Sequence, residues 1–225
     1  MKATTIDRRI AHDSIRLKTR DLGCLTLPQF LPPLEYTEVG VLEQMKLTDA
    51  EKLIIIMLTE IHDHLKIKDG VDPKFVQSAI YSGNTWGITW QYTGIFDGGT
   101  SDTPPKVHDV VEILDMWRLI ESSYANLSPE DKALVDKEIE PHGAKFSGFD
   151  GNNDCDRMGI ARFFINDLDQ FTNFKGRELN SHYIDSTEGY HRMLKVLEPI
   201  RLSIGNADLT AEQMIPILQA QRYPK

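Results

Sequence analysis

The chain has 225 residues, with 34 Asp and Glu against 25 Lys and Arg, which gives a formal net charge of -9 at pH 7. With 40% hydrophobic residues it holds enough apolar material for one globular domain of roughly 150–200 residues plus an appendage. This composition excludes intrinsic disorder, collagen-like repeats and a disulfide scaffold, and the net acidity opposes non-specific attraction to nucleic acid.

Residues 1–46 differ in composition from the rest of the chain. Residues 1–22 alternate basic and apolar positions, which predicts a short helix. Residues 23–37 carry three prolines among apolar neighbours. Because proline lacks an N–H donor and biases the preceding residue toward extended backbone, we expect an extended arm here. We therefore divide the chain into an N-terminal helix and arm over 1–46 and a helical domain over 47–225.

The first strong helix is predicted over residues 48–66. Thr48 and Glu51 have the spacing of a capping box, which marks a helix start. One stripe at helical spacing consists of Ile54, Leu58, Ile61 and Leu65. Ile55 and Ile56 lie off this stripe, so we expect the helix to be buried on more than one side.

Further helices follow from caps and apolar periodicity. They are expected at 72–83, 87–93, 104–125, 128–140, 154–172, 186–199 and from 210 onward. No stretch of five or more residues alternates as a strand would. The predicted fold class is therefore all-α: a compact multi-helix domain of six to eight helices, with an extended proline-containing N-terminal arm.

Common catalytic motifs are missing from the sequence. It contains no phosphate-binding loop, no dinucleotide fingerprint, no Gly-x-Ser-x-Gly elbow and no His-Glu-x-x-His helix. Asp150, Asn152 and Asp154 match positions 1, 3 and 5 of an EF-hand, but Ala161 replaces the closing glutamate. A turn followed by an aspartate helix cap explains this loop more simply. We therefore expect no cofactor.

A metal-dependent phosphohydrolase of the HD type is the alternative. Such enzymes bind a divalent metal through a histidine, a His-Asp pair and a distant aspartate, and the metal activates water against a phosphate ester. The candidate ligands here are His62, His108, Asp109 and Asp154. Solvated residues on the polar faces of helices would produce the same loose pattern. The hypothesis therefore requires all four side chains to lie within a few ångströms of one point.

An aromatic segment contains Trp86 and Trp90, which would suit a stacked ring ligand or base. No basic residue lies near them in the sequence, which favours a core plug or a subunit contact instead. A small helical domain has difficulty burying the off-stripe Ile55 and Ile56 and the apolar arm alone, which favours an oligomer formed through these isoleucines and the aromatic segment. We therefore take these four residues as the candidate interface of a homo-oligomer.

A series of segments, in chain order, carries a family resemblance. They are Leu47–Ile54, Trp86–Phe96, Val110–Trp117, Phe146–Asn153, Leu179–Ser181 and Tyr190–Leu194. The most specific marks are the loop residues Phe149, Asp150, Gly151, Asn152 and Asn153, followed later by Asn180 and Ser181. Over about 47–220 the chain resembles the bacterial YfbU family, a helical family of largely uncharacterised function.

This resemblance implies a cytosolic protein from a family associated with programmed bacterial cell death, without an established reaction. The family pattern has no His-Asp pair at the place of His108 and Asp109, which weakens the metal hypothesis. The marker residues carry over as marks of the family, not as catalytic residues. Physically, Asn152, Asn153 and Asn180 are suited to hydrogen bonds with backbone between helix layers.

The N-terminus has no apolar stretch typical of a signal peptide, and no apolar run approaches the ~20 residues that span a bilayer. Cys24 and Cys155 make no metal or redox spacing. We therefore expect a cytoplasmic protein with reduced thiols and no membrane contact.

The sequence favours a non-enzymatic interaction or regulatory protein, linked to bacterial stress or cell death. We expect it to form a homo-oligomer and to bind a protein partner that the sequence does not identify, and enzyme activity stays open through the phosphohydrolase alternative. A weaker alternative is a nucleic-acid-binding regulator, against which the net charge counts. Its basic residues would be Lys2, Arg8, Arg9, Arg16, Lys18 and Arg20.

Overall fold

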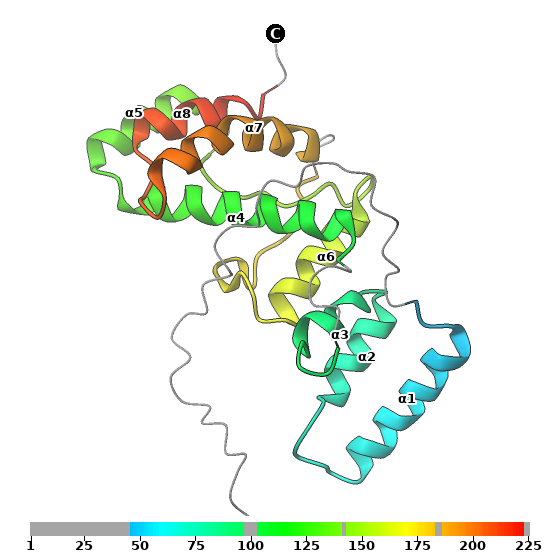
Figure 1. The fold of residues 1–225 in the computed structure, drawn as a ribbon. Helices are drawn as coiled ribbons and strands as arrows, with labels where there is room; N and C mark the ends of the chain where they lie inside the picture. The colour runs from blue at the N-terminus through cyan, green and yellow to red at the C-terminus, as the bar shows by residue number, and fades with distance from the viewer. Residues whose placement is uncertain (1–45, 97–102, 141–142, 183–185, 223–225) are drawn as a thin grey trace, which may run out of the picture. The chain divides into compact units, whose positions relative to one another are not determined.

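The computed structural model describes residues 46–96, 103–140, 143–182 and 186–222. Within these ranges the chain forms eight α-helices and no β-strand, which confirms the all-α prediction. Their bounds are α1 Asp49–His64, α2 Pro73–Tyr81, α3 Trp86–Gln91, α4 Pro105–Asn126, α5 Pro129–Ile139, α6 Cys155–Asn166, α7 Ser186–Ile204 and α8 Ala211–Gln219 (Figure 1). The helix and arm expected over 1–46 lie outside the described residues.

Local capping explains where several helices begin. At the start of α1 the Thr48 hydroxyl accepts from the Glu51 amide, and the Glu51 carboxylate accepts from the Thr48 amide at 2.7 Å. Thr210 and Gln213 form the same reciprocal box before α8. Such boxes satisfy N–H groups that have no partner inside the helix. These starts agree with the sequence prediction to within one residue.

Two helix ends differ from the prediction. α6 ends at Asn166 instead of near 172, because Asp169 and Phe171 adopt left-handed backbone with φ of 55° and 49°. α7 continues through Pro199 to Ile204, although the sequence suggested an end near 199. The left-handed residues are neither glycine nor asparagine, so the usual sequence signal for a helix stop is missing.

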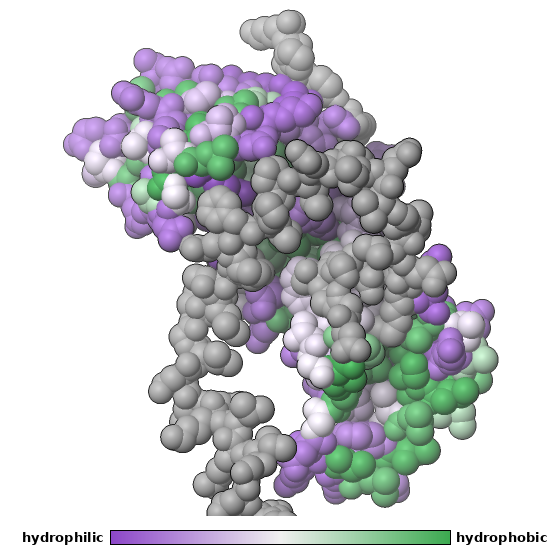
Figure 2. All heavy atoms as spheres, in the orientation of Figure 1, coloured by the Kyte–Doolittle hydropathy of each residue, from purple (hydrophilic) through white to green (hydrophobic). Residues whose placement is uncertain are grey.

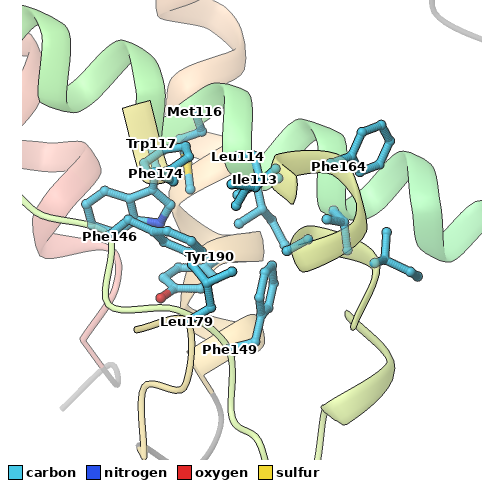
Figure 3. Packing of buried hydrophobic residues seen from close by; sticks show 14 of the residues in the cluster. Ile113, Leu114, Met116, Trp117, Phe146, Phe149, Phe164, Phe174, Leu179 and Tyr190 are labelled. Carbon is cyan, nitrogen blue, oxygen red and sulfur yellow. The ribbon is translucent and has the colours of Figure 1, made fainter. Parts of the chain in front are cut away.

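The core forms around α4, whose inward side chains are fully buried: Val110, Ile113, Leu114, Met116, Trp117 and Ile120. α4 packs on α6 and α7, while α8 packs on α5 and α7 (Figure 1). Trp117 contacts the rings of Phe146 and Tyr190, and both of these contact Phe149, with centroids of neighbouring rings 5.6–6.1 Å apart (Figure 3). The cluster thereby joins α4 and α7 to the loop over 146–153.

Helix α1 packs chiefly on α2. Ile55 and Ile56 are half-buried against the core, and Thr59 is the buried residue of the helix. The Thr59 hydroxyl accepts a hydrogen bond from the side-chain amide of Gln77 in α2 at 2.9 Å. One face of α1 is therefore attached to the domain by two isoleucines and a polar contact.

Candidate functional site

The opposite side of α1 exposes a row of large apolar side chains, here named the α1 face. Its members are 53–63% exposed: Leu53, Ile54, Met57, Leu58, Ile61 and Leu65. Figure 2 shows the hydrophobic surface that gathers over this helix. Soluble proteins seldom expose a contiguous apolar surface of this kind unless it binds something.

This arrangement corrects the orientation that the sequence suggested. The stripe of Ile54, Leu58, Ile61 and Leu65 turns to solvent, and the off-stripe Ile55 and Ile56 turn toward the core. At ~100° per residue the centres of these two faces lie roughly 140° apart around the helix. Periodicity detects an apolar stripe but not the neighbour that covers it, and α2 covers the other side.

Charges on α1 and its flanks are balanced. Between residues 46 and 68 the four lysines Lys46, Lys52, Lys66 and Lys68 offset the four acids Asp49, Glu51, Glu60 and Asp63, so this segment is neutral with histidines uncharged. The acids Asp49 and Glu51 lie in the first turn, whereas Lys66 and Lys68 follow the end of the helix. Lys46 and Lys52 accompany these two acids, and Glu60 and Asp63 precede the two lysines, so each end of the segment is itself balanced in charge.

The two tryptophans of the predicted interface lie inside or against the core. Trp86 is 4% exposed, and Trp90 is half-buried beside it with ring centroids 6.0 Å apart. Trp86 also contacts the rings of Phe163 and Phe164 in α6, at 5.5 and 5.0 Å. These contacts correspond to a core plug that anchors α3. The exposed apolar surface lies on α1 and not at the tryptophans.

The family-marker loop is held by hydrogen bonds around Asp150, which is 3% exposed. Its carboxylate accepts from the backbone amide of Asn152 at 2.9 Å and from the side-chain amide of Asn153 at 2.6 Å. These donors hold the pKa of Asp150 below its usual value. Because both donors belong to the loop itself, Asp150 acts here as a turn former.

The second marker segment is joined to the loop through backbone. Phe149 donates to the Leu179 carbonyl at 2.9 Å and accepts from the Ser181 amide at 2.8 Å. The side-chain oxygen of Asn180 accepts from the amides of Gly151 and His182, each at 3.1 Å. The backbone role expected for Asn180 is therefore found, whereas Asn153 bonds a carboxylate instead.

Glycine is required where these two segments meet. Gly148 has φ of +98°, and a Cβ built there would lie 2.2 Å from the Leu179 carbonyl oxygen. A Cβ on Gly151 would lie 2.7 Å from the Asn180 side chain. The Tyr190 hydroxyl donates to the Gly148 carbonyl at 2.7 Å, and burial raises the pKa of Tyr190. Phe149, Asp150, Gly151, Asn153 and Asn180 thus have a structural explanation.

The four candidate metal ligands do not assemble. Across the described residues no group of three His, Cys, Asp or Glu side chains is placed to hold a metal ion. His62 is on α1 and His108 is exposed on α4. Asp109 and Asp154 are both bound by Arg157, at 2.5 and 2.8 Å. The phosphohydrolase hypothesis therefore has no assembled ligand set in this part of the chain.

These two aspartates instead belong to an ion-pair network that sequence reasoning missed. His191 Nε2 lies 2.7 Å from the second oxygen of Asp109, and the Thr187 hydroxyl donates to Asp154. The network connects α4, the start of α6 and α7. Asp154 precedes α6 but makes no side-chain capping bond, which corrects the expected aspartate cap. Only the three-residue spacing of Asp154 and Arg157 is visible in the sequence.

A shallow cavity of about 420 Å³ lies elsewhere, beside Arg118 and Glu121. Both charged groups already have partners: Glu121 binds Arg177 through two contacts of 2.7 Å, and Arg118 binds Asp115 at 2.5 Å. The cavity therefore offers no unpaired charge among these groups to select a ligand.

The fold and these sites define an all-α protein with a structural polar loop and an exposed apolar helix. The sequence model of the YfbU domain matches residues 45–220, and the chain belongs to this family. It is 28% identical over 116 residues to UPF0304 protein MJECS11 of Methanocaldococcus jannaschii, which covers 49% of this chain. The chain spans about 65% of the length of that curated relative. No solved structure matches the chain. None of the helices in the described ranges has the length and apolar character needed to cross a bilayer.

Proposed function

We propose that this YfbU-family protein is a non-enzymatic interaction protein, and that it binds a helix of another protein molecule on the α1 face. The observation that carries the proposal is the row of six apolar side chains, each more than half exposed, on a helix attached to the domain by its opposite side.

The energetics of solvent exposure support a binding role. Burying a whole Leu, Ile or Met side chain is worth about 1.5–3 kcal/mol, so covering the exposed half of one recovers roughly 1 kcal/mol. Residues on the α1 face recur at spacings of three and four, which matches the ridges with which helices pack on one another. A helix is therefore a better match to this surface than a flat or extended partner.

The competing hypotheses have less support. The HD ligand set is not assembled in the described part of the chain, and the basic residues of the nucleic-acid hypothesis, within 1–20, lie outside it. A cytoplasmic location and a link to bacterial stress or cell death stay predictions, because they depend on the absence of targeting signals and on the family resemblance.

Photo-cross-linking tests the proposal. A benzophenone amino acid replaces Met57, which is on the α1 face, or Leu202, a 72% exposed leucine on α7 that serves as the matched control. Irradiation of the full chain in cells should give a defined intermolecular adduct from position 57 and none from position 202. Peptide mass spectrometry should place the partner's attachment point on an apolar helical segment. Equal yields at both positions, or no adduct at 57, would contradict a protein-binding role for α1.

A further inference from the structure

We infer that the partner helix bound on the α1 face is a basic amphipathic helix, with an apolar stripe bordered on both sides by lysine or arginine. This inference rests on the proposed function and names the chemistry of its partner. Two observations support it: the arrangement of charges around α1 and the net charge of the whole chain. Along the axis of the helix the charges are balanced, but around its circumference they are not.

Carboxylates border the α1 face on both sides. At ~100° per residue the six apolar side chains span an arc of roughly 140°, from Leu53 on one edge to Leu58 on the other. Within α1 no Asp, Glu, Lys or Arg lies inside this arc. Glu60 lies about 20° beyond Leu53, Glu51 lies about 20° beyond Leu58, and both glutamates are exposed. The α1 face is therefore an apolar surface with an acidic residue at each edge.

The lysines of this segment are placed differently. Lys52, the one lysine inside α1, lies opposite the centre of the face and pairs with Asp49 at 3.2 Å. Lys46, Lys66 and Lys68 lie beyond the two ends of the helix. The edges of the α1 face along the helix are therefore acidic, although the segment as a whole is neutral.

Both border carboxylates can meet a charge on a partner. Glu51 belongs to the capping box, in which the amide and the hydroxyl of Thr48 donate to the same oxygen, Oε2, at 2.7 and 2.8 Å. These hydrogen bonds hold the pKa of Glu51 below its usual value, so the group is ionised at neutral pH. Among the described residues, Glu60 has no side-chain partner. A cation on the bound helix would therefore not have to displace an existing ion pair at either edge.

Charge complementarity selects basic residues on the partner. When two helices pack through apolar stripes, the charged residues beside the stripes set which partner binds. Lysine or arginine beside the partner's stripe would lie near Glu51 and Glu60, whereas acidic residues in those places would be repelled. The net charge of -9 on the chain acts in the same direction, because it attracts a cationic partner over longer range.

Two synthetic peptides of 16 residues, the length of α1, test the inference. Both carry the same leucine stripe, which is bordered by lysines in one peptide and by glutamates in the other. Fluorescence anisotropy with the purified full chain, at about 0.15 M ionic strength, should show about tenfold tighter binding of the lysine-bordered peptide. A third peptide keeps the lysines but has serines in place of the leucines, and it should not bind. Equal affinities for the first two peptides, no binding of the lysine-bordered peptide, or equally tight binding of the third would overturn the inference.

Charge-reversal variants of the full chain locate the effect. Glu60→Lys should weaken binding of the lysine-bordered peptide about threefold to tenfold, because an attractive pair at the edge becomes a repulsive one. Asp63→Lys is the matched control: it makes the same change of charge at an exposed residue of α1 that lies about 160° from the centre of the face. It should change the affinity less than about twofold. Equal losses in the two variants would mean that net charge alone attracts the peptide, which would overturn the inference.

The photo-cross-linking experiment distinguishes this inference from the proposed function. An adduct from position 57 to an apolar helix bordered by lysine or arginine supports both. An adduct to a helix bordered by acidic residues, or to a second copy of this chain, retains the interaction role and removes the basic partner. No adduct from position 57 removes both.

Discussion

Asp150 in the family-marker loop is 3% exposed, whereas Leu58 in α1 is 57% exposed. The loop over 146–153 buries a carboxylate because amide donors satisfy its oxygens, and the backbone of Leu179 and Ser181 holds the loop from outside. α1 exposes leucines because its neighbour α2 contacts the other side of the helix. In these two regions, the burial of a side chain therefore depends on which partners surround it and not on its polarity.

The loop and the α1 face also differ in what explains their distinctive sequences. The glycines, Asp150 and Asn180 are accounted for within the chain, by a close backbone approach or a satisfied hydrogen bond. The α1 face has no such account within the described residues. Substitutions in the loop should therefore change the stability of the domain, and substitutions on the α1 face should change association.

The largest effect is expected at Gly148. Gly148→Ala combines a positive φ with a Cβ 2.2 Å from the Leu179 carbonyl oxygen, so it should lower the free energy of unfolding by about 3–5 kcal/mol. Urea denaturation measures this change. Gly159→Ala in α6 is the control, because a Cβ added there would have no atom within 4 Å, and it should stabilise by about 0.5–1 kcal/mol. A loss of unfolding free energy below about 1 kcal/mol for Gly148→Ala would contradict the close approach of Gly148 to the Leu179 carbonyl.

The ion-pair network next to the loop should give the second largest effect. Arg157→Met removes the guanidinium that Asp109 and Asp154 share, and these carboxylates, only 20% and 13% exposed, keep the contacts with His191 and Thr187 alone. We expect a loss of about 1.5–3 kcal/mol in unfolding free energy, reduced from the fully buried case by partial exposure. Lys106→Met is the control, since its 2.6 Å pair with Asp156 is exposed to solvent and should contribute far less to stability. Equal losses of unfolding free energy in the two variants would show that the burial of an ion pair does not determine its contribution to stability.

A smaller effect, which depends on pH, is expected at Asp150. Its folded-state pKa is lowered by the amides of Asn152 and Asn153, so the ionised carboxylate stabilises the fold above its unfolded pKa of about 3.9. This contribution is lost as pH falls through the folded-state pKa. Asp150→Asn should therefore be less stable than wild type at pH 7, and the gap should narrow below about pH 4. Asp63→Asn, on the surface of α1, controls for loss of one negative charge; a gap that is constant with pH would contradict this origin.

The smallest effect on the fold itself is expected on the α1 face. At the lowest measurable protein concentration, Leu58→Glu with Ile61→Glu should change the unfolding free energy by less than ~0.5 kcal/mol. If copies associate through α1, the wild-type Tm should rise with protein concentration and the variant's should not. Differential scanning fluorimetry over a concentration series measures both. A loss above ~2 kcal/mol at low concentration would mean that these side chains are packed within the chain.

Local signals made much of the fold predictable from sequence. Thr48 with Glu51, and Thr210 with Gln213, lie within three residues of each other, so their capping bonds are visible as patterns. The end of α6 was not predictable, because Phe171 adopts a left-handed conformation that its residue type does not favour and no glycine marks the stop. The existence of these helices could be read from local patterns, whereas this helix end could not.

The candidate site was less predictable, since its determinants are distant in the chain. Arg157 reaches Asp109 across 48 positions and His191 reaches it across 82, so no spacing rule connects them. The apolar stripe of α1 was recognised, but its orientation depends on α2, where Gln77 binds Thr59 from 18 positions away. Sequence periodicity identified the surface, and only tertiary structure showed which side faces solvent.

The attachment of α1 through Ile55, Ile56 and Thr59 has a consequence for local unfolding. A helix that packs chiefly on one neighbour can open without disrupting the core around α4, so its amide hydrogens should exchange with solvent faster than those of α4. A helix bound on the α1 face would suppress this local opening, since opening would then require release of the bound helix as well. Binding at this surface would therefore lower the amplitude of motion in the N-terminal part of the helical domain.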